Sequence, residues 1–102
     1  MRTEPEHFAL HRHHIRGFRH YPFLCVLQAP VAGGRDRIVC PVSTTDELGP
    51  TSPRLMIEGR DHVVMLRFML SLPVLALGEA VGSAQAIRPA IGNALDLLFF
   101  GI

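Results

Sequence analysis

Short apolar segments alternate with turn-forming residues through the first two thirds of the chain. Residues 21–28 (YPFLCVLQ) and 37–42 (RIVCPV) are rich in β-branched and aromatic side chains, which favour strands. Pro22 fits only at the start of the first of them. Gly33 and Gly34 lie between the two segments and favour a turn. We therefore expect a hairpin with a long loop.

A second hairpin is expected in residues 54–69, where two apolar runs flank the turn-forming sequence EGRD. A weaker strand pattern begins at residues 8–10. Pro73 and Gly78 break any long helix in the stretch that follows the second hairpin. We expect a buried connection there, with a short strand at residues 74–77.

The pattern changes to a helical period from about Pro89, a residue tolerated in the first turn of a helix. Apolar residues then recur at spacings of three and four and form one stripe, which we expect to face the core. The stripe consists of Ile87, Ile91, Ala94, Leu95 and Leu98. At about 100° per residue, Asn93, Asp96 and Phe100 project away from this stripe, and Phe99 lies at its boundary. Phe100 therefore either folds back onto its own domain or forms part of a contact surface.

This order of elements, strands first and one helix last, predicts an α+β fold. We expect one domain over residues 1–102, with a small antiparallel β-sheet or barrel and a single C-terminal α-helix. Hydrophobic residues make up 48% of the chain, which is enough to build a core. The formal net charge of +1 argues against nucleic-acid binding through bulk positive charge.

The N-terminal segment is polar where a signal peptide has its apolar region. The longest uncharged apolar run, residues 68–78, is too short to span a bilayer and contains Pro73. We therefore expect a cytoplasmic protein without membrane association. Cys25 and Cys40 each lie in an apolar run, and we expect buried, reduced thiols rather than a disulfide between them.

The basic segment from His11 to His20 is the most distinctive polar feature. His11 and His13 would share one face of a strand, with His14 nearby, but no further ligand has the spacing of a zinc site. We expect a solvated segment, no native metal site and no cofactor. The alternatives are contact with phosphates or with an acidic protein partner. No serine lies in a nucleophile elbow, and Glu79 is expected to be a cap or interface residue rather than a general base.

Four segments of the chain resemble one known family in colinear order. The ending IGNALDLLFFGI resembles I-x-N-A-I-N-L-M-F-W-G-I, the C-terminus of CcdB, the toxin of a plasmid toxin–antitoxin pair. SLPVLALGEAV is similar to the family's S-V-P-V-x-V-I-G-E-x-V, RDRIVCPV to R-R-M-V-I-P-L, and FLCVLQ to F-V-x-V-Q. The resemblance covers nearly the whole chain except its first 20 residues and the loop at residues 43–53.

This resemblance implies a homodimer with an SH3-like barrel, an added small sheet and a C-terminal helix. It further implies a non-enzymatic toxin for plasmid maintenance, which binds the A subunit of DNA gyrase and traps the enzyme on cleaved DNA. A CcdA-like antitoxin would neutralise it. The gyrase-binding positions carried over from the family are Asp96, Phe100, Gly101, Ile102, Pro30 and Val31.

Two positions on the helix differ from the family pattern, because Asp96 stands in place of Asn and Phe100 in place of Trp. The second change removes an N–H donor and the first adds a negative charge. Pro30 and Val31 also differ, since the family has two isoleucines there. Two alternative functions follow from the sequence. One is an mRNA-cleaving toxin with a similar barrel, in which the His- and Arg-rich segment supplies acid–base and phosphate-binding groups. The other is a CcdB-fold homologue that has lost gyrase poisoning.

Overall fold

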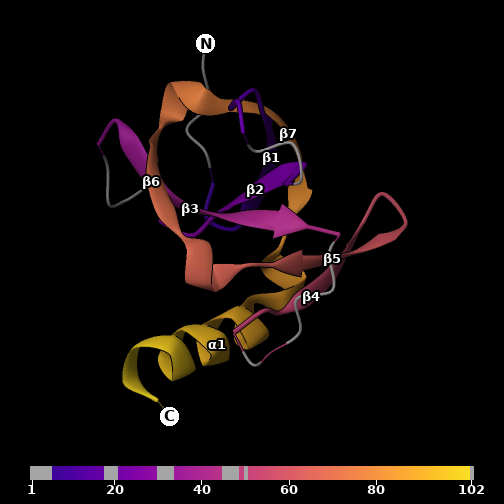
Figure 1. Cartoon of the computed structure of the whole chain (residues 1–102), viewed down its shortest axis with the longest axis vertical. Helices are drawn as coiled ribbons and strands as arrows, with labels where there is room; N and C mark the ends of the chain where they lie inside the picture. The colour runs from indigo at the N-terminus through magenta and orange to yellow at the C-terminus, as the bar shows by residue number, and fades with distance from the viewer. Residues whose placement is uncertain (1–5, 18–20, 30–33, 45–48, 50, 102) are drawn as a thin grey trace.

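The structure is a computed structural model that describes residues 6–17, 21–29, 34–44, 49 and 51–101. Within these residues a seven-stranded antiparallel sheet is followed by one α-helix (Figure 1). The strands are β1 (Ala9–His13), β2 (Phe23–Val26), β3 (Asp36–Ser43), β4 (Arg54–Ile57), β5 (Arg60–Val64), β6 (Leu70–Pro73) and β7 (Leu77–Ser83). The helices are α1 (Arg88–Phe100) and the short 3-10 turns η2 (Leu66–Phe68), η3 (Val74–Ala76) and η4 (Gln85–Ile87).

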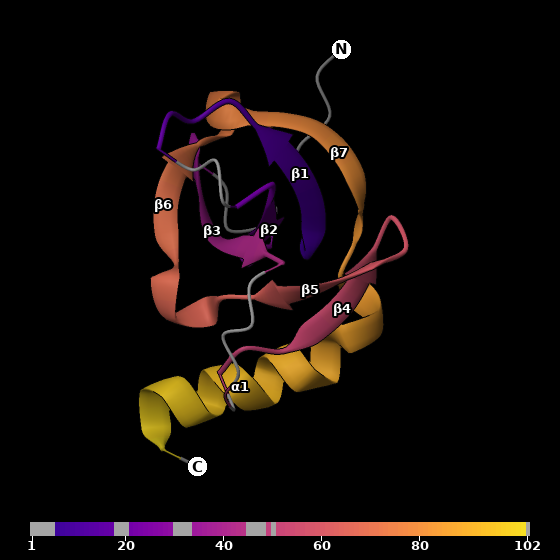
Figure 2. The same cartoon turned by 45° about the vertical axis from the view of Figure 1, so that its right-hand side comes forward.

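The sheet curls because its longest strand, β3, has different partners along its length. The first half of β3 pairs with β6, from Asp36 opposite Pro73 to Val39 opposite Leu70. Its other end pairs with β5, and the order of the main path is β4-β5-β3-β2-β1-β7. Figure 2 shows the resulting ring of strands, with α1 packed along the side formed by β4 and β5. This half-barrel with one C-terminal helix confirms the predicted α+β, SH3-like fold class.

Both predicted hairpins are present. Strands β2 and β3 pair in antiparallel register, with Leu24 opposite Pro41. Strands β4 and β5 are joined by a tight turn at Glu58 and Gly59, whose φ angles are 51° and 77°. Positive φ at both central residues is the geometry of a type I′ turn, whose twist matches that of the flanking strands. The turn is shorter than the four residues expected, because the last two, Arg60 and Asp61, belong to β5.

The segment between the second hairpin and the helix differs from the prediction. The expected strand at residues 74–77 is wrong: Val74–Ala76 form a 3-10 turn, and strands lie on both sides of it. The N–H of Val74 donates to the carbonyl of Arg35, 2.8 Å away, which fixes the turn against the start of β3. The connection is also not buried, because Leu75 is 75% exposed. Residues 66–68, expected to be strand, form the 3-10 turn η2 instead.

The main core lies between the curled sheet and α1. It contains buried residues from β1, β2, β3, β4 and the helix. Its members include Leu10, Phe23, Val42, Ile57 and Ile91. Cys25 and Cys40 are also in this core, buried and without a disulfide, so the prediction of buried, reduced thiols is confirmed.

A smaller cluster occupies the opposite face of β1, β2 and β3. It contains Ala9, Leu24, Val26 and Val39, covered by partly buried side chains from β6 and the start of β7. These two strands therefore cover the second face of the three central strands.

Candidate partner-binding surface at the end of the C-terminal helix

Helix α1 presents the predicted apolar stripe to the core. Pro89 lies in its first turn. Ile91 and Ala94 are fully or almost fully buried. Ile87, Leu95 and Leu98 are partly buried and pack against the same core. The predicted stripe is therefore confirmed, and it fixes the rotation of the helix about its own axis.

The side chains that project away from the stripe lie in solvent. Asp96 is exposed, and Phe100 is 74% exposed in the last helical turn. Phe100 therefore does not fold back onto its own domain. Phe99, expected at the boundary of the stripe, is also 62% exposed. The helix therefore ends in two adjacent exposed aromatic rings, whose exposure packing within the domain does not explain.

Gly101 ends the helix in the left-handed conformation, with φ 71°. Its N–H donates to the carbonyl of Leu97 at 3.0 Å, which satisfies one of the carbonyl groups that a helix leaves unpaired at its end. Only glycine adopts this conformation without a steric penalty. The glycine therefore turns the chain immediately after Phe100.

Of the six positions taken from the family resemblance, the structure brings together Asp96, Phe100 and Gly101. Ile102, Pro30 and Val31 lie outside the described residues. The arrangement of the loop positions relative to the helix therefore stays a prediction.

A third exposed aromatic residue lies near the helix. Phe68 in η2 is 47% exposed, and the Arg67 guanidinium lies over its ring, 5.8 Å from the centroid. The turn η2 contacts α1, and Figure 2 shows η2 above the C-terminal half of the helix. The position of Phe68 beside the helix was not predicted, because this residue lies in an apolar run that was expected to be a strand.

The electrostatic character of this helix end is negative. The last turn contains no basic residue, and the carbonyl groups at a helix C-terminus carry a partial negative charge. Asp96 adds a full negative charge one turn before the end. An apolar plate beside negative charge favours a partner that offers an apolar pocket and a nearby cation or N–H donor.

The histidine segment has mainly structural roles in β1. His11 is buried, and its Nδ1–H donates to the carbonyl of Gly78 at 2.9 Å. His13 accepts a hydrogen bond from the N–H of Ile15 at 3.1 Å through Nδ1, and its Nε2 pairs with the carbonyl of Tyr21. These bonds hold β1 against β7 and shape the turn after β1. Within the described part of the chain, no three His, Cys, Asp or Glu residues gather where they could hold a metal ion.

Arg12 is the exposed member of this segment with a defined partner. Its Nη2 lies 2.7 Å from Oε1 of Glu58, which belongs to the β4–β5 turn. The guanidinium also lies over the ring of Phe23, 5.2 Å from the centroid, and that ring is 5.4 Å from the ring of His62. The sequence did not predict this cluster, because its members come from β1, β2 and the β4–β5 hairpin, which are far apart along the chain. Glu79 is exposed.

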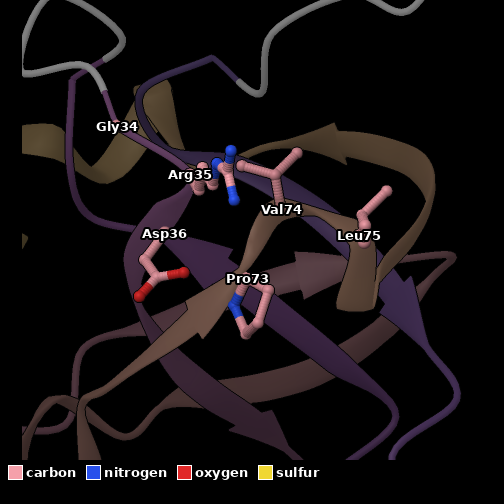
Figure 3. A pocket seen from close by; sticks show the side chains of 6 residues that line it. All are labelled: Gly34, Arg35, Asp36, Pro73, Val74 and Leu75. Carbon is pink, nitrogen blue, oxygen red and sulfur yellow. The ribbon is translucent and has the colours of Figure 1, made fainter.

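A pocket of about 590 Å³ opens beside the start of β3 (Figure 3). It is lined by Gly34, Arg35, Asp36, Pro73, Val74 and Leu75. The lining is mainly apolar, with one charge of each sign at its edge. None of these residues was expected to form a site.

Together, the curled sheet, the single C-terminal helix and the exposed aromatic helix end define a small α+β protein of the SH3-like barrel class. Residues 7–101 match the family model described as CcdB protein. The chain therefore belongs to the CcdB family, the toxin family that its sequence resembles. No curated protein sequence matches it.

Solved structures of similar fold are toxins and endoribonucleases of mycobacteria. One is an endoribonuclease in complex with its cognate antitoxin from a mycobacterial species, with 16% identity, a TM-score of 0.75, and coverage of 91% of this chain and 92% of that chain. Another is a toxin from Mtb, with 20% identity, a TM-score of 0.74, and coverage of 88% and 99%. A third is the Mycobacterium tuberculosis toxin MazF-mt6, with 19% identity, a TM-score of 0.70, and coverage of 89% and 95%. At these identities the likeness is one of fold. Within the described residues, no helix is long and apolar enough to cross a membrane.

Proposed function

We propose that this CcdB-family protein is the toxin of a type II toxin–antitoxin pair that binds the A subunit of DNA gyrase and traps the gyrase–DNA cleavage complex. The observation that carries this proposal is the exposed Phe100 in the last turn of α1, on the face that also bears Asp96. Gly101, Ile102 and the loop positions Pro30 and Val31 complete the proposed surface by resemblance to the family.

Binding through this surface would draw its energy from the aromatic end of the helix. Burying an exposed aromatic ring in a partner's pocket removes apolar area from water, and truncating such a hot-spot residue costs roughly 2 kcal/mol or more of binding energy. Phe100 supplies the ring without the indole N–H donor of the family's Trp. Asp96 requires a cation or N–H donor on gyrase, because an unpaired carboxylate in an interface is strongly unfavourable.

The proposed activity needs neither a cofactor nor a catalytic residue. A homodimer would present two copies of the helix end related by a two-fold axis, which suits a two-fold gyrase. A CcdA-like antitoxin would compete for the toxin, and a neighbour of the same fold was solved with its cognate antitoxin. The toxin would act in the cytoplasm, where gyrase acts on DNA.

The test is a cleavage assay with purified gyrase, supercoiled plasmid and the full-length protein. The proposal predicts that trapped cleavage complexes accumulate, that Phe100→Ala abolishes them, and that Phe100→Trp retains or increases them. Leu75→Ala is the matched control, since Leu75 is equally exposed on a different element, η3, and should leave poisoning unchanged. If wild-type protein leaves gyrase turnover and cleavage unaltered, the proposal is wrong.

An RNA-cleaving toxin is the second candidate, and the cluster around Arg12 favours it. An exposed guanidinium paired with the carboxylate of Glu58 combines a phosphate-binding cation with a potential general base. The solved neighbours that are endoribonucleases support the same candidate. Incubating the protein with single-stranded RNA distinguishes the two: cleavage that Glu58→Gln removes and Phe100→Ala leaves intact would favour the ribonuclease.

A CcdB-family protein that pairs with its antitoxin and no longer poisons gyrase is the remaining alternative. The substitutions at Asp96 and Phe100 motivate it. Inactivity of the wild type in both assays, together with gyrase poisoning by Phe100→Trp, would favour this alternative and would identify the lost indole as the cause.

A further inference from the structure

The two cysteines of the chain lie directly opposite each other in neighbouring strands. The β2–β3 register pairs Cys25 with Cys40, and both side chains are completely buried in the same core cluster. Directly opposite residues of an antiparallel pair point to the same face of the sheet. The fold thus brings together two groups that the sequence separates by most of a hairpin.

The backbone geometry at this pair permits a disulfide. The N–H of Leu27 donates to the carbonyl of Ile38 at 2.9 Å, so the alternation of an antiparallel ladder makes Cys25–Cys40 a hydrogen-bonded pair. Cα atoms in such pairs are about 5.5 Å apart, within the roughly 4.4–6.8 Å that disulfides span. The Cβ atoms are about 4.5–5.5 Å apart, slightly more than a relaxed disulfide has. Bond formation therefore requires a small approach of the two strands.

We propose that Cys25 and Cys40 form a reversible intramolecular disulfide when the protein meets a peroxide. One thiolate sulfur attacks a peroxide oxygen of hydrogen peroxide, the O–O bond breaks, and hydroxide leaves, giving a sulfenic acid. The second sulfur then attacks the sulfenic sulfur, and water leaves as the S–S bond forms. The balance is two thiols and one hydrogen peroxide to one disulfide and two waters, with both electrons passing to the peroxide.

Burial makes this reaction slow, whereas strain in the bond makes it easy to reverse. Burial raises the pKa of the Cys40 thiol well above its ordinary value, and the neighbouring Cys25 raises it further. The reactive thiolate is therefore scarce, and the oxidation rate should increase with pH. Because the bond pulls the strands slightly together, it is more readily reduced than an unstrained structural disulfide. The proposal is independent of the function proposed above.

The experiment starts from reduced, full-length protein incubated with hydrogen peroxide under native conditions. The product is denatured, treated with an alkylating reagent and weighed by mass spectrometry. The expected product is a monomer lighter by two hydrogens with neither cysteine alkylated, and dithiothreitol should restore both alkylation sites. Separate sulfinic acids on the two cysteines, or a disulfide between two chains, would overturn the proposal.

Two variants test whether the register carries the reaction. Cys40→Ser should yield only oxygen adducts on Cys25. The double variant Val39→Cys with Cys40→Ser keeps two cysteines at nearly the same separation but places the new thiol on the opposite face of β3. It should form at least tenfold less intramolecular disulfide than the wild type. Equal yields would show that proximity along the chain, and not the strand register, brings the sulfurs together. If circular dichroism shows that this variant does not fold, the product formed by the wild-type protein decides whether the proposal stands.

Discussion

Ile91 and Phe100 lie on the same helix, and we predict opposite roles for them. Ile91 is completely buried in the main core, so Ile91→Ala removes core contacts and leaves a cavity, which should lower the free energy of unfolding by about 2–5 kcal/mol. Phe100 is 74% exposed, so folding removes only about a quarter of its side chain from water. Since full burial of a Phe contributes about 1.5–3 kcal/mol, Phe100→Ala should lower the free energy of unfolding by roughly 0.4–0.8 kcal/mol.

Urea denaturation followed by circular dichroism measures both values, with linear extrapolation to zero denaturant. Domains of this kind have an unfolding free energy of about 5–15 kcal/mol, so Ile91→Ala should shift the midpoint strongly and Phe100→Ala only slightly. In the gyrase assay we expect the variants to separate in the opposite way, with activity lost by Phe100→Ala although the fold is intact. A loss of stability with Phe100→Ala as large as with Ile91→Ala would refute the assignment of Phe100 to an exposed contact surface.

Four further predictions concern the fold. Gly78→Ala should destabilise the protein by about 1–3 kcal/mol in urea denaturation, because a Cβ there would lie 2.9 Å from the backbone oxygen of Arg12. Gly101→Ala should lower the melting temperature by several degrees, since the residue has φ 71° and a loss of about 1 kcal/mol shifts a small domain by roughly 4–8 °C. Glu58→Gln should change stability by less than about 1 kcal/mol and should weaken the dependence of the melting temperature on salt, because the ion pair is largely exposed. The pKa of the Cys40 thiol is raised in the folded state, so the folded protein keeps a proton that the unfolded chain releases above the ordinary pKa of 9.0. The free energy of unfolding should therefore fall as the pH rises above 9.0. Urea midpoints measured across that range should fall less for Cys40→Ser than for the wild type.

The predictable parts of the fold depend on neighbours in sequence. The two hairpins follow from β-branched runs joined by glycine-containing turns, and α1 follows from the period of its apolar residues. Strands β6 and β7 were missed because their partners are far along the chain: β6 pairs with β3, and β7 pairs with β1. Leu70–Ser83 therefore has no local signal that distinguishes two edge strands from an irregular connection.

The candidate surface divides in the same way. Asp96 and Phe100 are predictable because the helical period alone places them opposite the buried stripe. The position of Phe68 beside the helix was not predictable, because it depends on the 3-10 turn that interrupts an apolar run and brings η2 against α1. The Arg12–Glu58 pair likewise joins residues 46 positions apart, a contact that only the curling of the sheet creates.

The sequence by itself determined the class of the fold, the two hairpins, the C-terminal helix and its core-facing stripe, because turn chemistry and side-chain periodicity act between residues close along the chain. Its four motif-like segments also indicated the CcdB family, to which the chain belongs. Only the tertiary structure decided that β6 and β7 cover the second face of the central strands and that Cys25 faces Cys40. Each of these depends on strand register and sheet curvature, which are fixed when distant segments bury their apolar faces against one another.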